Sequence, residues 1–195
     1  MKKQSVKVLD VQGWLRGFQA SLVDRSNEVG VRLAGASAEQ WLNTELFAYL
    51  AATLTGDLYP YTEYQKRDVT VFRRSNFDVA AIMETKVLYR SYSPSSVRTR
   101  IEKLSSQLTD AQKKNQASVC VGLVFAAFVK WPEDIDPRKH PANPEAFNDR
   151  LHNEFRQVKD LKFAKQQLLV EVNAVKVGGV AVPKVALYGQ CVTLR

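Results

Sequence analysis

The first third of the chain carries apolar residues at the spacing of α-helices. In the stretch Val11–Leu33 the apolar positions recur every three, four or seven residues, which predicts one N-terminal helix. A second helix is predicted over Trp41–Leu54, because Ser37 suits the N-cap position and Gln40, three residues later, completes a capping box. Gly56 follows this stretch and indicates that the helix has ended.

Alternation of apolar and polar residues replaces the helical spacing after Gly56. Three stretches rich in Val, Tyr and Phe predict strands, and the charged tract Arg73–Asn76 predicts the turn between the last two. Such short connections join neighbouring antiparallel strands, so the stretches predict a meander. The three strands are Leu58–Tyr64, Asp68–Phe72 and Phe77–Tyr89.

The second half of the chain alternates between helical and strand patterns. Pro94 suits the start of an amphipathic helix that continues over Val97–Lys114, and the continuous apolar run Val119–Trp131 predicts a strand buried on both faces. The remaining predicted elements are a Pro-rich loop over Pro132–Pro144, a basic helix over Ala146–Phe163, and a hairpin of Leu168–Val177 and Pro183–Leu194 around Gly178-Gly179.

This order predicts a single α/β domain over residues 1–195 with a mixed central sheet. An N-terminal helix precedes a unit of helix, three-stranded meander, helix and strand, and a C-terminal helix and hairpin follow it. The length of 195 residues and the 45% share of hydrophobic residues are sufficient for one domain with a substantial core.

Charge and cysteine usage narrow the functional class. The formal net charge of +8 favours an anionic partner, most simply nucleic acid. Cys120 and Cys191 lie in apolar runs and are expected to be buried thiols in a reducing compartment. The N-terminus lacks the apolar run of a signal peptide, and the apolar stretch Val119–Val129 is too short to span a bilayer. We therefore expect a cytoplasmic protein without a membrane partner.

Glu84-Thr85-Lys86 closes an otherwise apolar strand. Strand side chains alternate between the two faces of a sheet, so Glu84 and Lys86 are predicted on one face and Thr85 on the other. The simplest explanation is a strand end that reaches solvent, because Glu-x-Lys is a common tripeptide. The alternative is a catalytic role, because two carboxylates and an amine on neighbouring strands suit metal-dependent cleavage of phosphodiester bonds.

Asp68 strengthens the catalytic interpretation. It opens the preceding strand of the meander and can therefore lie beside Glu84, whereas Asp78 lies roughly 20 Å from Glu84 along the same strand. Two neighbouring carboxylates stay ionised only when a positive charge compensates them, and Mg²⁺ favours such oxygen ligands. Lys86 is then placed to orient the attacking water or to stabilise charge on the phosphate.

Glu45 is a further candidate on the second predicted helix. Trp41, Tyr49 and Ala52 surround it at helical spacing, so it lies inside the apolar stripe, where an isolated carboxylate is costly. It is predicted either to pair with a basic side chain or to support the metal and its waters.

The arrangement resembles the PD-(D/E)XK nuclease superfamily, which has the restriction-endonuclease-like fold, over roughly Ser37–Trp131. By that resemblance Asp68 is the motif aspartate, Glu84 the motif glutamate and Lys86 the motif lysine, while Glu45 matches a helical glutamate of many members. The resemblance also implies that the backbone carbonyl of Thr85 is a metal ligand. Arg67 stands where the motif has proline.

The resemblance implies a Mg²⁺-dependent nuclease, with Mn²⁺ as a possible substitute, that acts on duplex DNA either as a homodimer or within a larger complex. Two other functions remain open: a non-catalytic nucleic-acid-binding or assembly subunit of a defence or repair complex, and an RNA-cleaving effector. Five basic residues near the motif are predicted to contact nucleic-acid phosphates or to form ordinary solvated faces. They are Arg73, Arg74, Arg98, Arg100 and Lys103.

Overall fold

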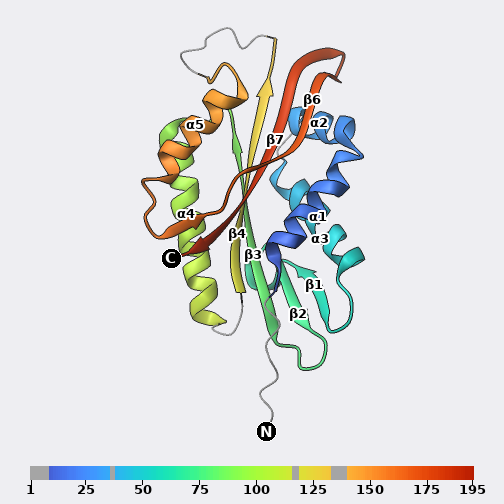
Figure 1. Ribbon diagram of the computed structural model, residues 1–195, viewed down its shortest axis with the longest axis vertical. Coiled ribbons are helices and arrows are strands. Elements are labelled where there is room, and N and C mark those ends of the chain that lie inside the picture. Colours follow the sequence, from blue (N-terminus) through green and yellow to red (C-terminus); the bar gives the residue numbers. More distant parts are fainter. Residues whose placement is uncertain (1–8, 36–37, 116–118, 133–139) are drawn as a thin grey trace.

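A mixed, curled sheet forms the centre of the protein, and helices cover both of its faces (Figure 1). The computed structural model describes residues 9–35, 38–115, 119–132 and 140–195. Within them the helices are α1 (Val11–Val23), α2 (Ser26–Gly35), α3 (Glu39–Thr53), α4 (Pro94–Lys114) and α5 (Pro144–Phe155). The strands are β1 (Leu58–Thr62), β2 (Val69–Arg73), β3 (Val79–Tyr89), β4 (Val119–Lys130), β5 (Leu161–Phe163), β6 (Gln167–Val177) and β7 (Val180–Leu194).

The strand order is β1-β2-β3-β4-β7-β5, and β6 pairs with β7. β1, β2 and β3 form the predicted antiparallel meander, and α4 then carries the chain across to β4, which runs parallel to β3. Ser93 starts α4 by accepting a hydrogen bond from the backbone N–H of Ser96, and Pro94 occupies its first turn, as predicted. The predicted α/β class, mixed sheet and meander are therefore confirmed.

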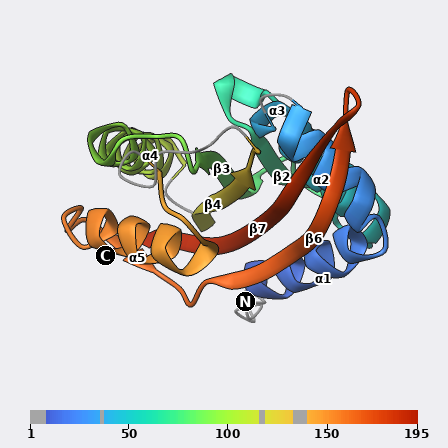
Figure 2. The same ribbon diagram turned by 90° about the horizontal axis from the view of Figure 1, so that it is seen from above.

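Two apolar layers hold the helices on the sheet. Figure 2 shows α1, α2 and α3 on one side and α4 and α5 on the other. Met83 and Val87 of β3 face the first group, while Leu88 of the same strand packs with the second. β3 and β4 are thus buried on both faces, as expected for the central parallel pair of a sheet.

The N-terminal helix predicted over Val11–Leu33 is two helices. α1 ends at Val23, and the backbone N–H of Arg25 bonds to the carbonyl of Leu22, which tightens the turn before α2 begins. The spacing concealed this break because Leu22 and Val29, on either side of it, are both fully buried in the same core. The predicted N-cap Ser37 lies outside the described residues, and α3 begins at Glu39.

The basic helix predicted over Ala146–Phe163 is also shorter. α5 ends at Phe155, and Leu161–Phe163 forms β5, which pairs with the end of β7. Phe163 stacks on Phe155 with ring centroids 4.6 Å apart, so its half-buried side chain packs on α5 from a strand and not from within a helix. Of the predicted loop Pro132–Pro144, residues 133–139 lie outside the described residues. No described helix has the length and apolar character needed to cross a membrane.

Candidate active site

The candidate site lies where β3 continues beyond its neighbour β2. The pairing of β2 with β3 ends at Val69, opposite Met83, while β4 stays paired with β3 up to Tyr89 (Figure 1). In the described strands, the edge of β3 from Glu84 onward therefore faces no strand on the β2 side. Backbone groups at such an edge need other partners.

Side chains from three segments provide those partners. Asp68 accepts a hydrogen bond from the backbone N–H of Thr85 at 2.7 Å, and Glu39 accepts one from the backbone N–H of Val87 at 3.1 Å. The ammonium group of Lys86 donates to the carbonyl of Thr85 at 2.6 Å and lies 3.7 Å from Glu39. Two carboxylates and one amine thus converge on a short length of strand edge that has no strand partner on the β2 side.

Thr85 connects this edge to α3. Its hydroxyl contacts Asp68 at 3.0 Å and also donates to the side-chain oxygen of Asn43. Glu84, its neighbour, bonds instead to Gln107 of α4, on the other side of the sheet. The predicted alternation of Glu84 and Thr85 between the two faces is therefore confirmed.

Glu84 is fully buried and is already charge-compensated by arginine. Its carboxylate accepts hydrogen bonds from Arg67 at 2.9 Å and from the amide of Gln107 at 3.0 Å. Burial raises the pKa of Glu84 above its usual value, although the hydrogen bond from Arg67 opposes the shift. Arg67 also binds Asp110 at 2.6 Å. Arg67 thus supplies to Glu84 the positive charge that was expected from a metal ion.

The helical carboxylate at the site is Glu39, which the sequence interpretation missed. The signal was available, because Glu39 and Asn43 are one helical turn apart and present polar groups on one side of α3. Glu45 instead forms an ion pair with Arg25 and accepts a hydrogen bond from the indole of Trp41 at 3.1 Å. Of the two roles predicted for Glu45, these contacts match the pairing with a basic side chain.

A polar cavity of about 420 Å³ opens over this edge. Its lining includes Glu39, Asn43 and Asp68 together with Tyr89, Tyr92 and Arg100. Arg100 extends from α4 over the ring of Tyr92, 4.5 Å from its centroid, and lies 3.9 Å from Glu39. The cavity therefore combines anionic groups on one wall with a cation on another.

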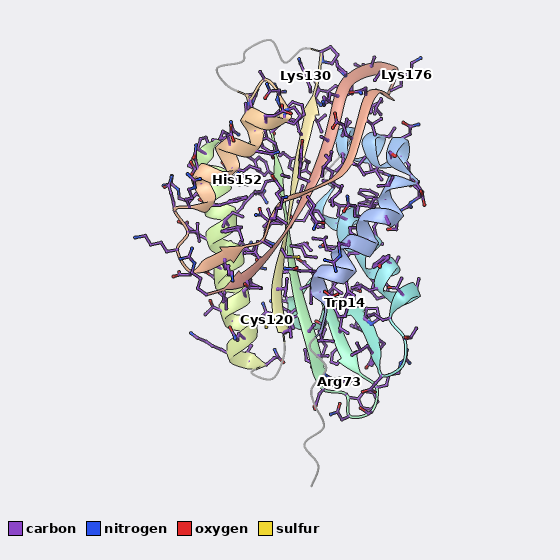
Figure 3. All side chains as sticks on the ribbon, viewed as in Figure 1. Trp14, Arg73, Cys120, Lys130, His152 and Lys176 are labelled. Carbon is purple, nitrogen blue, oxygen red and sulfur yellow. The ribbon has the colours of Figure 1, made fainter. Side chains whose placement is uncertain are left out.

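The other predicted phosphate contacts are dispersed. Arg73 lies at the hairpin end of the sheet, far from Lys130 at the opposite end of β4 (Figure 3). Arg74 covers the ring of Tyr59 at 5.1 Å, and Arg98 makes two hydrogen bonds to the buried carboxylate of Glu154. Lys103 is exposed on α4. Of the five basic residues, Arg100 is the one that lines the cavity.

The oxygen donors at the edge are of the type that Mg²⁺ prefers. Asp68, Glu39 and the carbonyl of Thr85 supply carboxylate and carbonyl oxygens, and Mg²⁺ commonly binds one or two carboxylates, waters and substrate phosphate. In the part of the chain that the structure describes, no group of three or more His, Cys, Asp or Glu side chains is arranged to hold a metal ion.

Comparisons of the chain with protein-family models, curated proteins and solved structures found no match.

Proposed function

We propose that this protein is a divalent-metal-dependent nuclease that acts on DNA, with its active site at the open edge of β3. The observation that carries the proposal is the convergence of Asp68, Glu39 and Lys86 on the backbone of Thr85 and Val87. Asp68 and Glu39 line the cavity and can bind a cation there, and the ammonium group of Lys86 lies 3.7 Å from Glu39. The net charge of +8 supports an anionic substrate.

Each residue has a distinct role in the proposal. Asp68, Glu39 and the carbonyl of Thr85 would hold Mg²⁺, for which Mn²⁺ would substitute. Bound there, the ion would supply polarisation of the scissile phosphate and a lowered pKa for an attacking water. Lys86 is 5% exposed and stabilises the charge that develops on the phosphate, since a buried ammonium acts in a low dielectric. Arg100 holds a neighbouring phosphate at the cavity wall.

The restriction-endonuclease-like core is part of the same proposal. The order α3, β1-β2-β3, α4, β4 supports it, with Asp68 beside β2 and Glu84-Thr85-Lys86 within β3. Glu84, a predicted metal ligand, is bonded to Arg67 and to Gln107 of α4, so the metal site proposed here is built from Asp68, Glu39 and Thr85 without it.

The Arg67–Glu84 pair favours a second function, a non-catalytic nucleic-acid-binding or assembly subunit. An arginine that permanently neutralises the motif glutamate leaves less negative charge to attract a cation. A metal site needs that charge, whereas a structural module gains a satisfied buried ion pair.

Cleavage assays distinguish the two functions. Labelled duplex DNA, single-stranded DNA and RNA are incubated with Mg²⁺, Mn²⁺ or EDTA and with wild type, Asp68→Asn or Lys86→Met. We expect metal-dependent cleavage, with DNA preferred, and a loss of about 100-fold or more in either variant. Asp149→Asn and Lys176→Met are matched controls on exposed positions of α5 and β6 and should retain activity.

Cleavage that persists in EDTA, or that both site variants retain, would contradict the site assignment. If wild type binds nucleic acid but cleaves none of the three substrates with either metal, the non-catalytic function is the correct one.

A further inference from the structure

A second cavity adjoins the proposed active site at the carboxyl ends of the parallel strands β3 and β4. Its volume is about 300 Å³, and Leu33 and Ala34 of α2, Tyr89 of β3, and Val129 and Trp131 at the end of β4 contribute to its walls. Ligands of open α/β sheets often bind beyond the carboxyl ends of parallel strands. The position of this cavity is therefore that of a binding site.

Tyr89 lines both cavities. Its hydroxyl accepts a hydrogen bond from the backbone N–H of Ala38, just before α3, and its ring contacts Tyr92 edge-on with centroids 5.4 Å apart. These contacts fix Tyr89 between the two cavities. It lies four residues beyond Thr85 on β3, a span of about 13 Å. A ligand that enters both cavities must be elongated and must continue past Tyr89.

The two cavities differ in chemistry. Carboxylates, Asn43 and Arg100 line the first, whereas the second has aliphatic and aromatic side chains together with Ser91 and His140. The second cavity also includes Arg90, but its guanidinium is buried, donates to the carbonyl of Pro141 at 2.6 Å and covers the ring of Phe128. Arg90 therefore supports the wall. The second cavity is suited to a flat, apolar group attached to an anionic chain.

We propose that the second cavity binds an unpaired nucleobase of the substrate strand, while the scissile phosphate occupies the first. Unpaired bases are commonly bound by stacking on aromatic side chains, and Trp131 and Tyr89 provide such surfaces. This inference rests on the proposed nuclease function. It narrows the substrate to DNA with unpaired nucleotides next to the cleavage position, such as a flap, gap or frayed end, because a paired base cannot enter.

The test measures binding of a DNA duplex with a short single-stranded flank that carries 2-aminopurine, whose fluorescence falls when the base stacks. EDTA prevents cleavage, so the readout does not depend on activity. We expect wild type to quench the flank, and Trp131→Ala to bind it about tenfold more weakly without quenching. Trp131→Phe keeps an aromatic surface and should restore part of both effects.

Two further variants keep the test informative if Trp131→Ala folds poorly. Ala34→Leu fills the cavity without removing an aromatic ring and should also weaken binding of the flank. Trp14→Ala removes an indole from α1, which Figure 3 shows far from Lys130 and the cavity end of β4, and should bind like wild type. A fully paired duplex should bind equally to wild type and to all four variants.

Equal binding and quenching by wild type, Trp131→Ala and Ala34→Leu would overturn the base-binding proposal, even if the protein cleaves DNA. Conversely, flank binding that depends on Trp131 in a protein that cleaves nothing would support the base site and contradict the nuclease function.

Discussion

At the scale of single residues, Thr85 organises the candidate site. Its backbone N–H, its carbonyl and its hydroxyl each bond to a polar side chain, and these side chains come from β3 itself, from α3 and from the segment before β2. Thr85, between the charged residues Glu84 and Lys86, therefore helps to position Asp68 and Lys86. The strand alternation predicts which way Thr85 points, but it does not reveal this role.

Thr85 and Thr70 form a matched pair for testing that role, because both are fully buried. The hydroxyl of Thr85 bonds to Asn43 and Asp68, whereas among the described residues the hydroxyl of Thr70 has no partner. We expect Thr85→Val to lower the free energy of unfolding by about 1–2 kcal/mol. Thr70→Val should leave it unchanged or raise it, since a methyl group replaces an unsatisfied polar group.

Urea denaturation of both variants in EDTA measures these differences. Equal destabilisation by the two substitutions would show that shape, and not the hydrogen bonds of Thr85, determines the effect.

The sequence correctly predicted the direction of a side chain where the alternation of side chains along a strand determines it. The opposite orientation of Glu84 and Thr85 follows from alternation in a strand and is observed. The partners of a carboxylate depend on residues distant in the chain, so the pairing of Glu84 with Arg67 could not be deduced from the motif. The position of Glu45 in an apolar stripe likewise did not distinguish a metal site from an ion pair with Arg25.

At the scale of elements, the meander is held together by its turns. Asp57 precedes β1 and accepts hydrogen bonds from the side chain and the backbone of Ser75 at 2.8 and 2.7 Å. Ser75 belongs to the turn between β2 and β3. Asp57 therefore ties the start of β1 to that turn and helps to position the strands on which Asp68 and Glu84 depend.

This contact makes the stability of the meander depend on pH. The hydrogen bond from the Ser75 hydroxyl lowers the pKa of Asp57 from its usual value of about 4. Its stabilising contribution is therefore complete above the unfolded-state pKa and is lost as the pH falls through the lower folded-state pKa. We expect Asp57→Asn to be less stable than wild type at pH 7 and the difference to shrink below about pH 4.

Unfolding by urea at pH 7, 5, 4 and 3 measures this dependence. A difference between the two proteins that stays constant over this range would mean that the charge of Asp57 has no role.

Element boundaries were predicted where apolar spacing and helix caps agree. β2, β3 and α4 match their predicted ranges closely because their burial patterns and Pro94 mark them locally. The break between α1 and α2 and the short strand β5 were missed. Both depend on tertiary contacts, since β5 exists through its pairing with the end of β7.

At the scale of the whole molecule, the sheet order brings distant segments to one edge. The pairing of β2 ends early while β4 continues along β3. This difference leaves one edge of β3 without a strand partner, and Glu39 of α3 and Asp68 bond to that edge instead. The α/β class follows from the element order in the sequence. The open edge does not, because the registers of three strands determine it together.

The net charge of +8 favours DNA binding only where basic side chains can reach the phosphates. Arg100 lines the cavity, whereas Arg98 is held by the buried Glu154. We expect Arg100→Gln to weaken DNA binding and to reduce the slope of log K against log salt by about one. Arg98→Gln should leave that slope unchanged and lower stability, because it leaves Glu154 without its arginine.

Fluorescence anisotropy titrations at several salt concentrations give both slopes. If the two substitutions reduce the slope equally, Arg100 in the cavity contacts DNA phosphates no more than Arg98 does, and the prediction is wrong.

The central claim is that the open edge of β3 binds a divalent cation through Asp68, Thr85 and Glu39. Titration with Mn²⁺, followed by electron paramagnetic resonance, tests it on wild type, Asp68→Asn, Glu39→Gln and Glu45→Gln. We predict one bound ion per chain, with affinity at least about tenfold weaker in the first two variants and unchanged in Glu45→Gln. Wild-type affinity in Asp68→Asn, or a loss of affinity confined to Glu45→Gln, would contradict the proposed site.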